Sequence, residues 1–236
     1  MANEPAATQG LSGSLRMRIT NLFFDLDGTL TDSRVGIIRS IQHATRALGI
    51  EPPPEESLGW CVGPPMRENF ARLLGTDDSM LIDRAFAHYL ERYESIGYRE
   101  NRVYDGVPAM LTAVTPGRRL IVATSKLTSS AERILAEFKL RDFFEGVFGS
   151  ERDGRFADKR ELVPHVLGAA RLDARVTAMV GDRVHDIDGG RAAGIVTIGA
   201  LWGYGTRDEL SGANMLCEAP ADLPAILEGY ASGSPS

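Results

Sequence analysis

The chain has 236 residues, 43% of them hydrophobic, and a formal net charge of −6. This length and composition suffice for one large domain with a buried core and exclude disorder as its main state. No run of Lys or Arg exceeds two residues, so we expect no nucleic-acid partner. The longest apolar runs have the length of strands, which argues against a membrane segment. Two cysteines and no secretory signal predict a cytoplasmic location without a disulfide framework.

Short apolar runs alternate with helical patterns along most of the chain, and turn residues follow each run. Four of the runs are predicted as strands: 19–24, 119–124, 176–181 and 195–200. Three segments are predicted as helices: 128–139, 159–170 and 188–193. This alternation predicts an α/β fold with a Rossmann-like parallel sheet that is buried on both faces.

One long segment, residues 34–104, breaks the alternation. Two stretches within it, 35–48 and 79–93, have the spacing of amphipathic helices, with no good strand between them. This pattern predicts an all-helical cap inserted into the core. The expected organisation in chain order is a disordered tail at 1–17, a core domain at 18–33 and 105–232, and the cap domain at 34–104.

Two aspartates stand at the end of the first predicted strand, in the sequence FFDLDGTL. Asp25 and Asp27 are separated by one residue, and the break at Gly28 allows the second to swing above the first. The carboxyl ends of parallel strands are where open α/β sheets bind ligands. Because close carboxylates repel each other, a cation or a shared proton is implied, and ligation by oxygen alone favours Mg²⁺.

A second acidic pair follows the predicted strand 176–181, in the sequence GDRVHD. Asp182 and Asp186 are four residues apart, so they face the same way if the turn is helical. The spacing predicts that both complete the metal site. Asp186 fits equally well as an acidic residue at the N-terminus of a helix.

Lysine is rare in this chain, with three lysines against 23 arginines, and two of the three stand at suggestive positions. Lys126 follows Thr124 and Ser125 at the end of a strand, where hydroxyl and backbone N–H groups can hold a phosphoryl oxygen. Lys159 opens a predicted helix, where its compact ammonium can bridge a nucleophile and a phosphate. The structural alternatives are that Thr124 caps the next helix and that Lys126 is a solvated turn residue.

Taken in order, DLDGTL at 25–30, Thr124 after a strand, Lys159 and GDRVHD at 181–186 resemble the four motifs of the haloacid dehalogenase superfamily. The GPP of CVGPP resembles its phosphoglycolate-phosphatase-like branch, which includes members described as nucleotidases. The resemblance implies a phosphatase in which Asp25 is the nucleophile that forms an aspartyl-phosphate. It also implies that Asp27 is the general acid and then the general base.

The resemblance extends to ligands. It implies Mg²⁺ bound by the carboxylates of Asp25 and Asp182 and the main-chain carbonyl of Asp27, with Asp186 behind them or reached through water. The substrate would be a small phosphomonoester such as phosphoglycolate, a nucleotide or a sugar phosphate, and the protein a monomer or homodimer. Four residues would hold the phosphoryl group, the last of them also being counted as catalytic: Thr124, Ser125, Lys126 and Lys159.

Several relatives within the superfamily differ in chemistry. A phosphonoacetaldehyde hydrolase needs a lysine in its cap, and residues 34–104 contain none, which excludes that reaction. A dehalogenase normally lacks the second aspartate, so Asp27 favours phosphoryl chemistry. A hexose-phosphate mutase has the same core residues, and a catalytically silent binding protein has the same fold, so both alternatives stay open.

Overall fold

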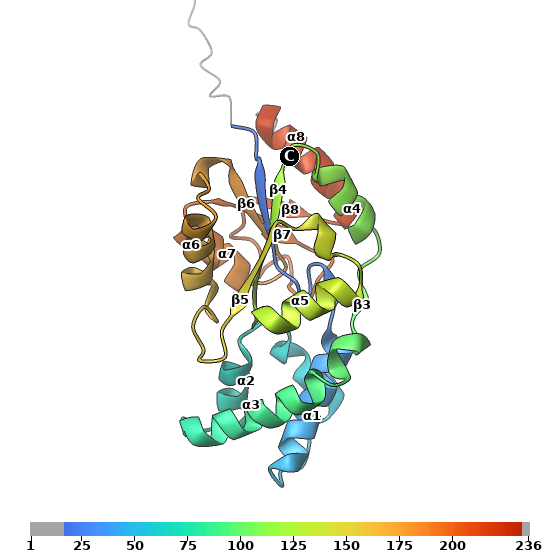
Figure 1. The fold of residues 1–236 in the computed structure, drawn as a ribbon, viewed down its shortest axis with the longest axis vertical. Helices are drawn as coiled ribbons and strands as arrows, with labels where there is room; N and C mark the ends of the chain where they lie inside the picture. The colour runs from blue at the N-terminus through green and yellow to red at the C-terminus, as the bar shows by residue number, and fades with distance from the viewer. Residues whose placement is uncertain (1–16, 233–236) are drawn as a thin grey trace, which may run out of the picture.

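The computed structural model describes residues 17–232, so the tail predicted at 1–17 lies, except for Met17, outside the described residues. Within this part of the chain, six strands form one parallel sheet (Figure 1). The sheet confirms the predicted α/β fold with a Rossmann-like core. Its strands in spatial order are β5 (Gly146–Ser150), β4 (Arg119–Leu127), β1 (Asn21–Phe24), β6 (Thr177–Gly181), β7 (Val196–Ala200) and β8 (Met215–Cys217).

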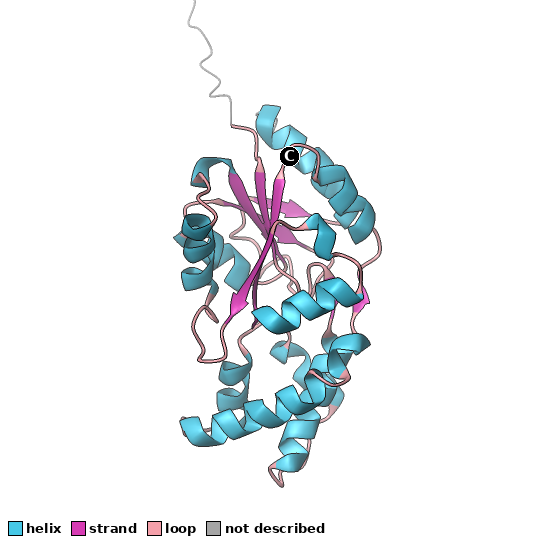
Figure 2. Cartoon of the chain, viewed as in Figure 1, coloured by secondary structure: helices cyan, strands magenta, loops and turns pink. Residues whose placement is uncertain are grey.

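Helices cover both faces of the sheet, as Figures 1 and 2 show. Successive side chains of a strand point to opposite faces, so Phe23 and Phe24 of β1 enter separate hydrophobic clusters. This explains why β1 is apolar throughout rather than alternating. None of the described helices has both the length and the apolar composition that a membrane crossing requires. The helices are α6 (Lys159–Ala169) and α7 (Val184–Ala192) on the Phe23 face, and α4 (Val107–Val114), α5 (Thr128–Glu137) and α8 (Leu223–Ser232) on the Phe24 face.

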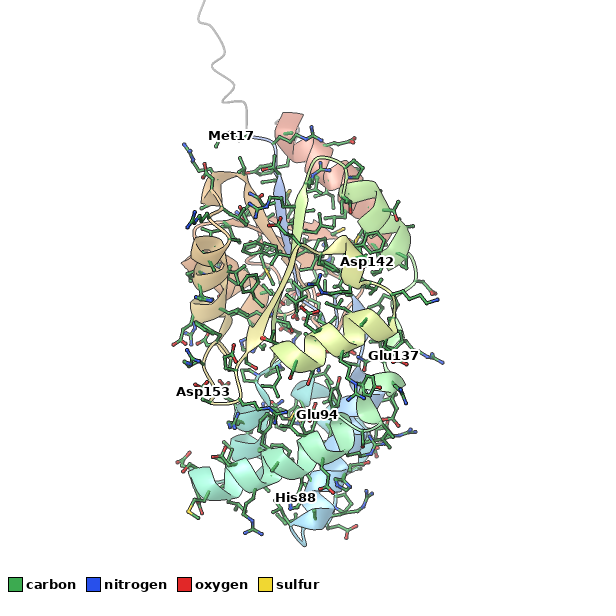
Figure 3. The ribbon with its side chains drawn as sticks, in the orientation of Figure 1. Met17, His88, Glu94, Glu137, Asp142 and Asp153 are labelled. Atoms are coloured by element: carbon green, nitrogen blue, oxygen red, sulfur yellow. The ribbon has the colours of Figure 1, made fainter. Side chains whose placement is uncertain are left out.

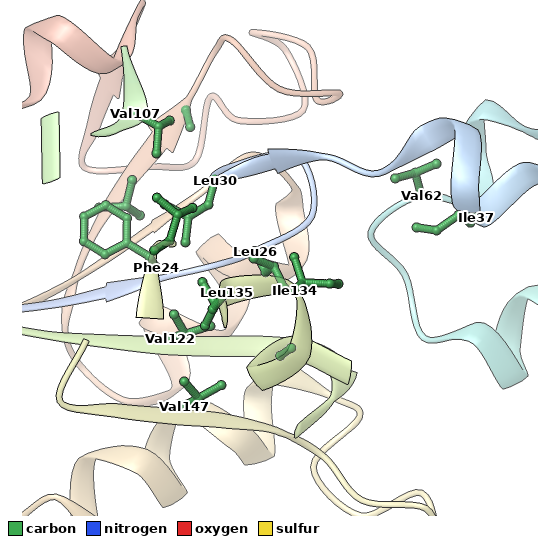
Figure 4. Packing of buried hydrophobic residues seen from close by; sticks show 14 of the residues in the cluster. Phe24, Leu26, Leu30, Ile37, Val62, Val107, Val122, Ile134, Leu135 and Val147 are labelled. Atoms are coloured by element: carbon green, nitrogen blue, oxygen red, sulfur yellow. The ribbon is translucent and has the colours of Figure 1, made fainter. Parts of the chain in front are cut away.

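The larger hydrophobic cluster positions the end of β1. Figure 4 shows Phe24 of β1 and Val122 of the neighbouring β4 packed with Leu135 of α5. Leu26 and Leu30, which belong to the turn after β1, are fully buried in the same cluster. Burying a side chain of this size stabilises the fold by about 1.5–3 kcal/mol. The apolar residues of the FFDLDGTL sequence therefore anchor the turn that carries both aspartates.

The structure contains elements that the sequence pattern does not predict, among them α4 and α8. β5 has two glycines in five residues, and β8 has three residues at the edge of the sheet, so neither gives a clear apolar run. Helix α7 begins at Val184, earlier than the predicted 188. The cause is Asp186, whose carboxylate accepts a hydrogen bond from the backbone N–H of Arg183 and caps the first turn.

Residues 34–104, which we call the cap segment, contain no strand except β3 (Arg102–Val103). They form a helical group beyond the carboxyl ends of the sheet strands, at the bottom of Figure 1. The pattern predicts two of its helices, whereas the third, α2, follows a turn-rich loop. Whether the segment is a separate domain stays a prediction. Its helices are α1 (Arg34–Ala47), η1 (Glu55–Cys61), α2 (Met66–Leu74), α3 (Ser79–Tyr93) and η2 (Gly97–Glu100).

A short antiparallel ribbon connects the core to the cap segment. It consists of β2 (Thr31–Asp32) paired with β3. Tyr204, from the loop after β7, fastens this ribbon to the core. Its hydroxyl donates to Asp32 Oδ1 at 2.6 Å and accepts from the backbone N–H of Ser33 at 2.9 Å. Both chain crossings between core and cap segment therefore lie beside one half-buried tyrosine.

Gly36 in α1 allows the cap segment to pack tightly. A Cβ at this position would lie 2.1 Å from the carbonyl oxygen of Gly97 in η2. We expect Gly36→Ala to lower the free energy of unfolding by about 1–3 kcal/mol, because the backbones must separate. Urea denaturation measures this change.

The matched control is Gly168→Ala in α6, where a Cβ would meet nothing within 4 Å. That change should be neutral or stabilise by up to about 1 kcal/mol through higher helix propensity. Equal effects of the two substitutions would contradict the packing constraint at Gly36.

Candidate active site

The two aspartates of the DLDGTL sequence lie at the carboxyl end of β1. The backbone N–H of Asp25 donates to the carbonyl of Val180 at 3.0 Å and continues the strand pairing, and its side chain is buried. The chain then turns at Gly28, whose φ of +91° favours glycine. A Cβ at Gly28 would lie 2.2 Å from Asp182 Oδ2. The glycine therefore brings the turn that carries Asp27 directly against the second acidic pair.

Asp182 follows β6 and is 0% exposed. Its carboxylate accepts hydrogen bonds from Thr29 Oγ at 3.1 Å and from the backbone N–H of Tyr204 at 2.8 Å. Burial, followed by the charges of Asp186 and Asp25, raises the pKa of Asp182 well above its usual range. The two hydrogen bonds do not offset the cost of burying this charge. The negative charge of Asp182 is therefore only partly compensated by its neighbours.

Lys159 is the first residue of α6 and lies between two acids. Its Nζ is 2.9 Å from Asp25 Oδ1 and also forms an ion pair with Asp186 Oδ1. The lysine side chain is 3% exposed. Burial opposes its charge, but Asp186 and Asp25 outweigh burial and raise the pKa of Lys159. The ammonium is therefore held charged in contact with the proposed nucleophile.

Asp186 lies in the first turn of α7 and has a different partner on each carboxylate oxygen. One oxygen caps the helix, as described above, and the other pairs with Lys159. Burial raises the pKa of Asp186, and the charge of Lys159 acts in the opposite direction. The residue is thus a helix-terminal acid and a member of the acidic cluster at the same time.

Lys126 has its side chain buried near the end of a strand, beside the acids. It belongs to β4, which extends beyond the predicted end at 124, and its side chain is 7% exposed. Its Nζ lies 2.7 Å from Asp27 Oδ2 and 3.0 Å from the hydroxyl of Tyr93 in the cap segment. The reading of Lys126 as a solvated turn residue is wrong, because the strand continues through it into the buried junction with α3.

Thr124 and Ser125 precede Lys126 on β4. Thr124 is buried, and its hydroxyl accepts from the backbone N–H of Lys126 at 3.3 Å. The reading of Thr124 as a helix cap is also wrong, because α5 begins at Thr128 with Leu127 at its N-cap position. The carbonyl of Ser125 accepts from Ser150 Oγ at 2.9 Å. The Thr124 side chain therefore contacts the end of its own strand and caps no helix.

The residues present fit a divalent cation. Asp25, Asp182 and Asp186 each have a carboxylate oxygen within 4.8 Å of the others, and all three are buried. Among the described residues, Oδ1 of Asp27 has no hydrogen-bond partner, and Oδ1 of Asp25 is contacted by the Lys159 ammonium. Four carboxylates thus face two ammonium groups in this cluster. Hard oxygen ligands with uncompensated negative charge are what Mg²⁺ and similar cations bind.

A cavity of about 230 Å³ separates this site from the cap segment. Asp27 and Lys126 line its inner end, and the aromatic rings of Phe86, Tyr89 and Tyr93 form its cap side. The last two rings are stacked, with centroids 5.3 Å apart. The cavity is therefore apolar and aromatic on one side and charged at the end where the aspartates lie.

Contacts around the cavity rim connect the cap segment to the core. Arg67, the second residue of α2, donates to Asp83 at 2.9 Å and to the carbonyl of Arg152 at 3.1 Å. Arg152 in turn pairs with Glu94, which Figure 3 labels where α3 meets the core. Arg67 thus connects α2 to α3 and to the loop that carries Arg152.

Sequence reasoning misses three residues that organise the site. Thr29 and Tyr204 hold Asp182, and Tyr93 contacts Lys126. Tyr89 and Tyr93 are four residues apart on one amphipathic helix, so the spacing indicates that they share a face. It does not indicate which residues of the core that face contacts. Tyr204 carries no comparable signal, because it stands in a loop about twenty residues from the nearest motif.

Comparisons with known proteins agree with this geometry. A protein of Pseudomonas aeruginosa named 5'-nucleotidase is 42% identical over 211 residues, which cover 89% of this chain and 95% of the relative. The tyrosine-protein kinase PtkA of Mycobacterium tuberculosis is 40% identical over 188 residues, which cover 79% of this chain but 64% of the kinase. The crystal structure of a predicted phosphatase from Clostridium acetobutylicum is 33% identical, with a TM-score of 0.86 over 90% of this chain and 100% of that one.

A family model described as haloacid dehalogenase-like hydrolase matches residues 22–200. The match spans the sheet strands β1, β4, β5, β6 and β7 and every residue of the acidic cluster. It confirms the resemblance drawn from the four sequence motifs. The chain belongs to the haloacid dehalogenase-like hydrolase family.

Proposed function

We propose that this protein is a Mg²⁺-dependent phosphatase that hydrolyses a small phosphomonoester through an aspartyl-phosphate on Asp25. The observation that carries the proposal is the environment of Asp25. Its side chain is 2% exposed, and Oδ1 lies 2.9 Å from the Lys159 ammonium, beside two further buried acids that could hold a cation. Burying a carboxylate next to other carboxylates is costly, and a paired ammonium and a cation at this place are what a phosphoryl-accepting nucleophile needs.

In the first step, an oxygen of Asp25 attacks the phosphorus of the substrate. The bond between phosphorus and the ester oxygen breaks, and the leaving alkoxide takes a proton from Asp27. Asp27 lines the cavity and is buried, with Oδ1 free of hydrogen bonds among the described residues. This position suits a group that passes a proton to a leaving group held in the cavity.

In the second step, Asp27 accepts a proton from water, and the water oxygen attacks the phosphorus of the aspartyl-phosphate. The bond between phosphorus and the Asp25 oxygen breaks, which releases inorganic phosphate and restores the carboxylate. Two in-line displacements replace one very slow hydrolysis, and the same residue serves first as acid and then as base.

Positive charge is needed because an anionic phosphate approaches an anionic carboxylate. Thr124, Ser125, Lys126 and Lys159 would hold the non-bridging oxygens, with Lys159 already in contact with Asp25. Bound Mg²⁺ would supply further charge stabilisation at the phosphoryl oxygens. Its ligands would be the carboxylates of Asp25 and Asp182 and the main-chain carbonyl of Asp27, with Asp186 behind them.

The cap segment would exclude water during the first step and admit it for the second. Hinges at 32–34 and 104–106 fit this role, since the chain crosses between core and cap segment there. In the closed arrangement described here, the rim contacts of Arg67 and Arg152 hold the segment against the core. We treat residues 34–104 as a mobile cap on these grounds.

Among the phosphate esters considered, the cavity favours one whose leaving group contains a flat ring. The stacked rings of Tyr89 and Tyr93 offer a surface for aromatic contact. The Pseudomonas aeruginosa relative named 5'-nucleotidase supports a nucleoside monophosphate over phosphoglycolate or a sugar phosphate. The cytoplasmic location and the monomeric or homodimeric state stay predictions.

Phosphate release from a panel of monoesters, with Mg²⁺ or with excess EDTA, tests the proposed function. We expect metal-dependent release, fastest from a nucleoside monophosphate. Asp25→Asn should lower the rate at least about 10³-fold, because the nucleophile is lost, while the melting temperature stays close to that of the wild type. Near-normal release by this variant would refute the covalent mechanism. Transfer of phosphate to a second sugar phosphate, without net release, would favour the mutase.

Asp27→Asn tests the acid and base role. With p-nitrophenyl phosphate, whose leaving group needs little protonation, Asp25 should still be phosphorylated, but water activation should slow by about 10²–10⁴-fold. Phosphoenzyme should then accumulate and be visible by intact mass after an acid quench. If the variant turns over without any accumulation, Asp27 has another role.

Asp182→Asn tests the metal site by stability. Because burial raises the pKa of Asp182, its carboxylate destabilises the metal-free protein at pH values above the ordinary pKa of aspartate. In EDTA at pH 7 the variant should therefore be at least as stable as the wild type. Adding Mg²⁺ at 100 times its Kd should stabilise the wild type by about 2.7 kcal/mol and the variant much less. An equal gain in both proteins, measured by urea denaturation, would place the ion elsewhere.

A further inference from the structure

Three buried polar groups connect the cap segment to Asp27. The hydroxyl of Tyr93, at the end of α3, lies 3.0 Å from Nζ of Lys126, and that Nζ lies 2.7 Å from Asp27 Oδ2. Tyr93 is 1% exposed. The three residues come from the cap segment, from β4 and from the turn after β1, so the contacts exist together where the cap segment meets the core.

Lys126 holds the carboxyl group of Asp27. Within residues 17–232, the ion pair with Lys126 is the one hydrogen-bonding or ionic contact of that carboxyl, since Oδ1 has no partner. A lysine side chain has about 2 kcal/mol of rotamer entropy to lose when it is fixed. The orientation of Asp27 therefore depends on what immobilises Lys126.

Tyr93 immobilises Lys126 in two ways. Its hydroxyl bonds the ammonium, and the ammonium also lies 4.4 Å from the centroid of the tyrosine ring. Both contacts come from the cap segment and would be lost if that segment moved away from the core. The ring contact remains in a Tyr93→Phe variant, whereas the hydrogen bond does not.

We propose that Tyr93 is a positioning residue, which fixes Lys126 against Asp27 and so makes proton transfer from Asp27 to the leaving group depend on closure of the cap segment. The inference rests on the proposed function. It explains why acid catalysis would occur only after the cap segment has closed: Asp27 would be well oriented only while the substrate is enclosed.

Dependence on the leaving group distinguishes this role from a general loss of binding or folding. The first turnover, in which Asp25 becomes phosphorylated, is measured by rapid quench with phenyl phosphate and with p-nitrophenyl phosphate. Phenolate needs protonation far more than p-nitrophenolate does. We expect Tyr93→Phe to slow phosphorylation by phenyl phosphate about 10-fold and by p-nitrophenyl phosphate less than about 2-fold. The 10-fold effect is smaller than the loss expected when acid catalysis is removed completely, because Asp27 is still present.

Tyr98→Phe is the matched control. Tyr98 is also a buried tyrosine of the cap segment, and its hydroxyl accepts from Arg133 of the core at 3.0 Å, with that guanidinium 3.9 Å from the ring centroid. It does not line the cavity. Tyr98→Phe removes a hydrogen bond of the same kind between cap segment and core, but at a place that does not contact Asp27. It should therefore leave the ratio of the two phosphorylation rates unchanged.

A Lys126→Met background tests whether Tyr93 acts through the lysine. If it does, adding Tyr93→Phe to Lys126→Met should change the rate ratio no further. An additive effect, an equal loss with both esters, or no change in Tyr93→Phe alone would each overturn the inference. These results are separate from failure of the proposed function, which would appear as phosphorylation in Asp25→Asn.

Discussion

The repulsion among buried carboxylates governs the structure of this protein. Asp25, Asp27, Asp182 and Asp186 gather at the carboxyl ends of β1 and β6, where like charges about 4 Å apart cost about 4 kcal/mol per pair at an effective dielectric of 20. Lys159 and Lys126 offset part of this cost by direct ion pairs. The raised pKa of Asp182 shows where the remaining charge is least compensated. A divalent cation is the group that this imbalance calls for.

The surrounding fold serves to keep the crowded arrangement in place. Two hydrophobic clusters clamp β1 between helices on both faces, and the buried residues Leu26 and Leu30 hold the turn that bears Asp27. Tyr204 connects the acidic cluster to the ribbon, through its backbone to Asp182 and through its hydroxyl to Asp32. The ribbon between core and cap segment and the acidic cluster are therefore supported by the same loop.

Much of the site is predictable because its residues stand at strand ends. A buried strand followed by two acids and a glycine indicates that Asp25 stands at the end of the strand and that Asp27 lies in the turn after it. The end of the second strand indicates the position of Asp182 in the same way. Lys126 is harder, since the apolar run of β4 ends before it while the hydrogen-bonded strand continues to Leu127. The strand β8 has only three residues and Tyr204 stands alone in a loop, so neither gives a periodic pattern that the sequence could reveal.

The sequence by itself determined the fold class, the insertion of a helical segment and the order of the acidic and basic motifs, because each depends on local periodicity or on residues close together in the chain. Only the tertiary structure decided which cation meets which acid. It placed Lys159 between Asp25 and Asp186, and Lys126 between Asp27 and Tyr93. Such pairings join residues far apart in sequence, and they depend on how the sheet, its helices and the cap segment pack together.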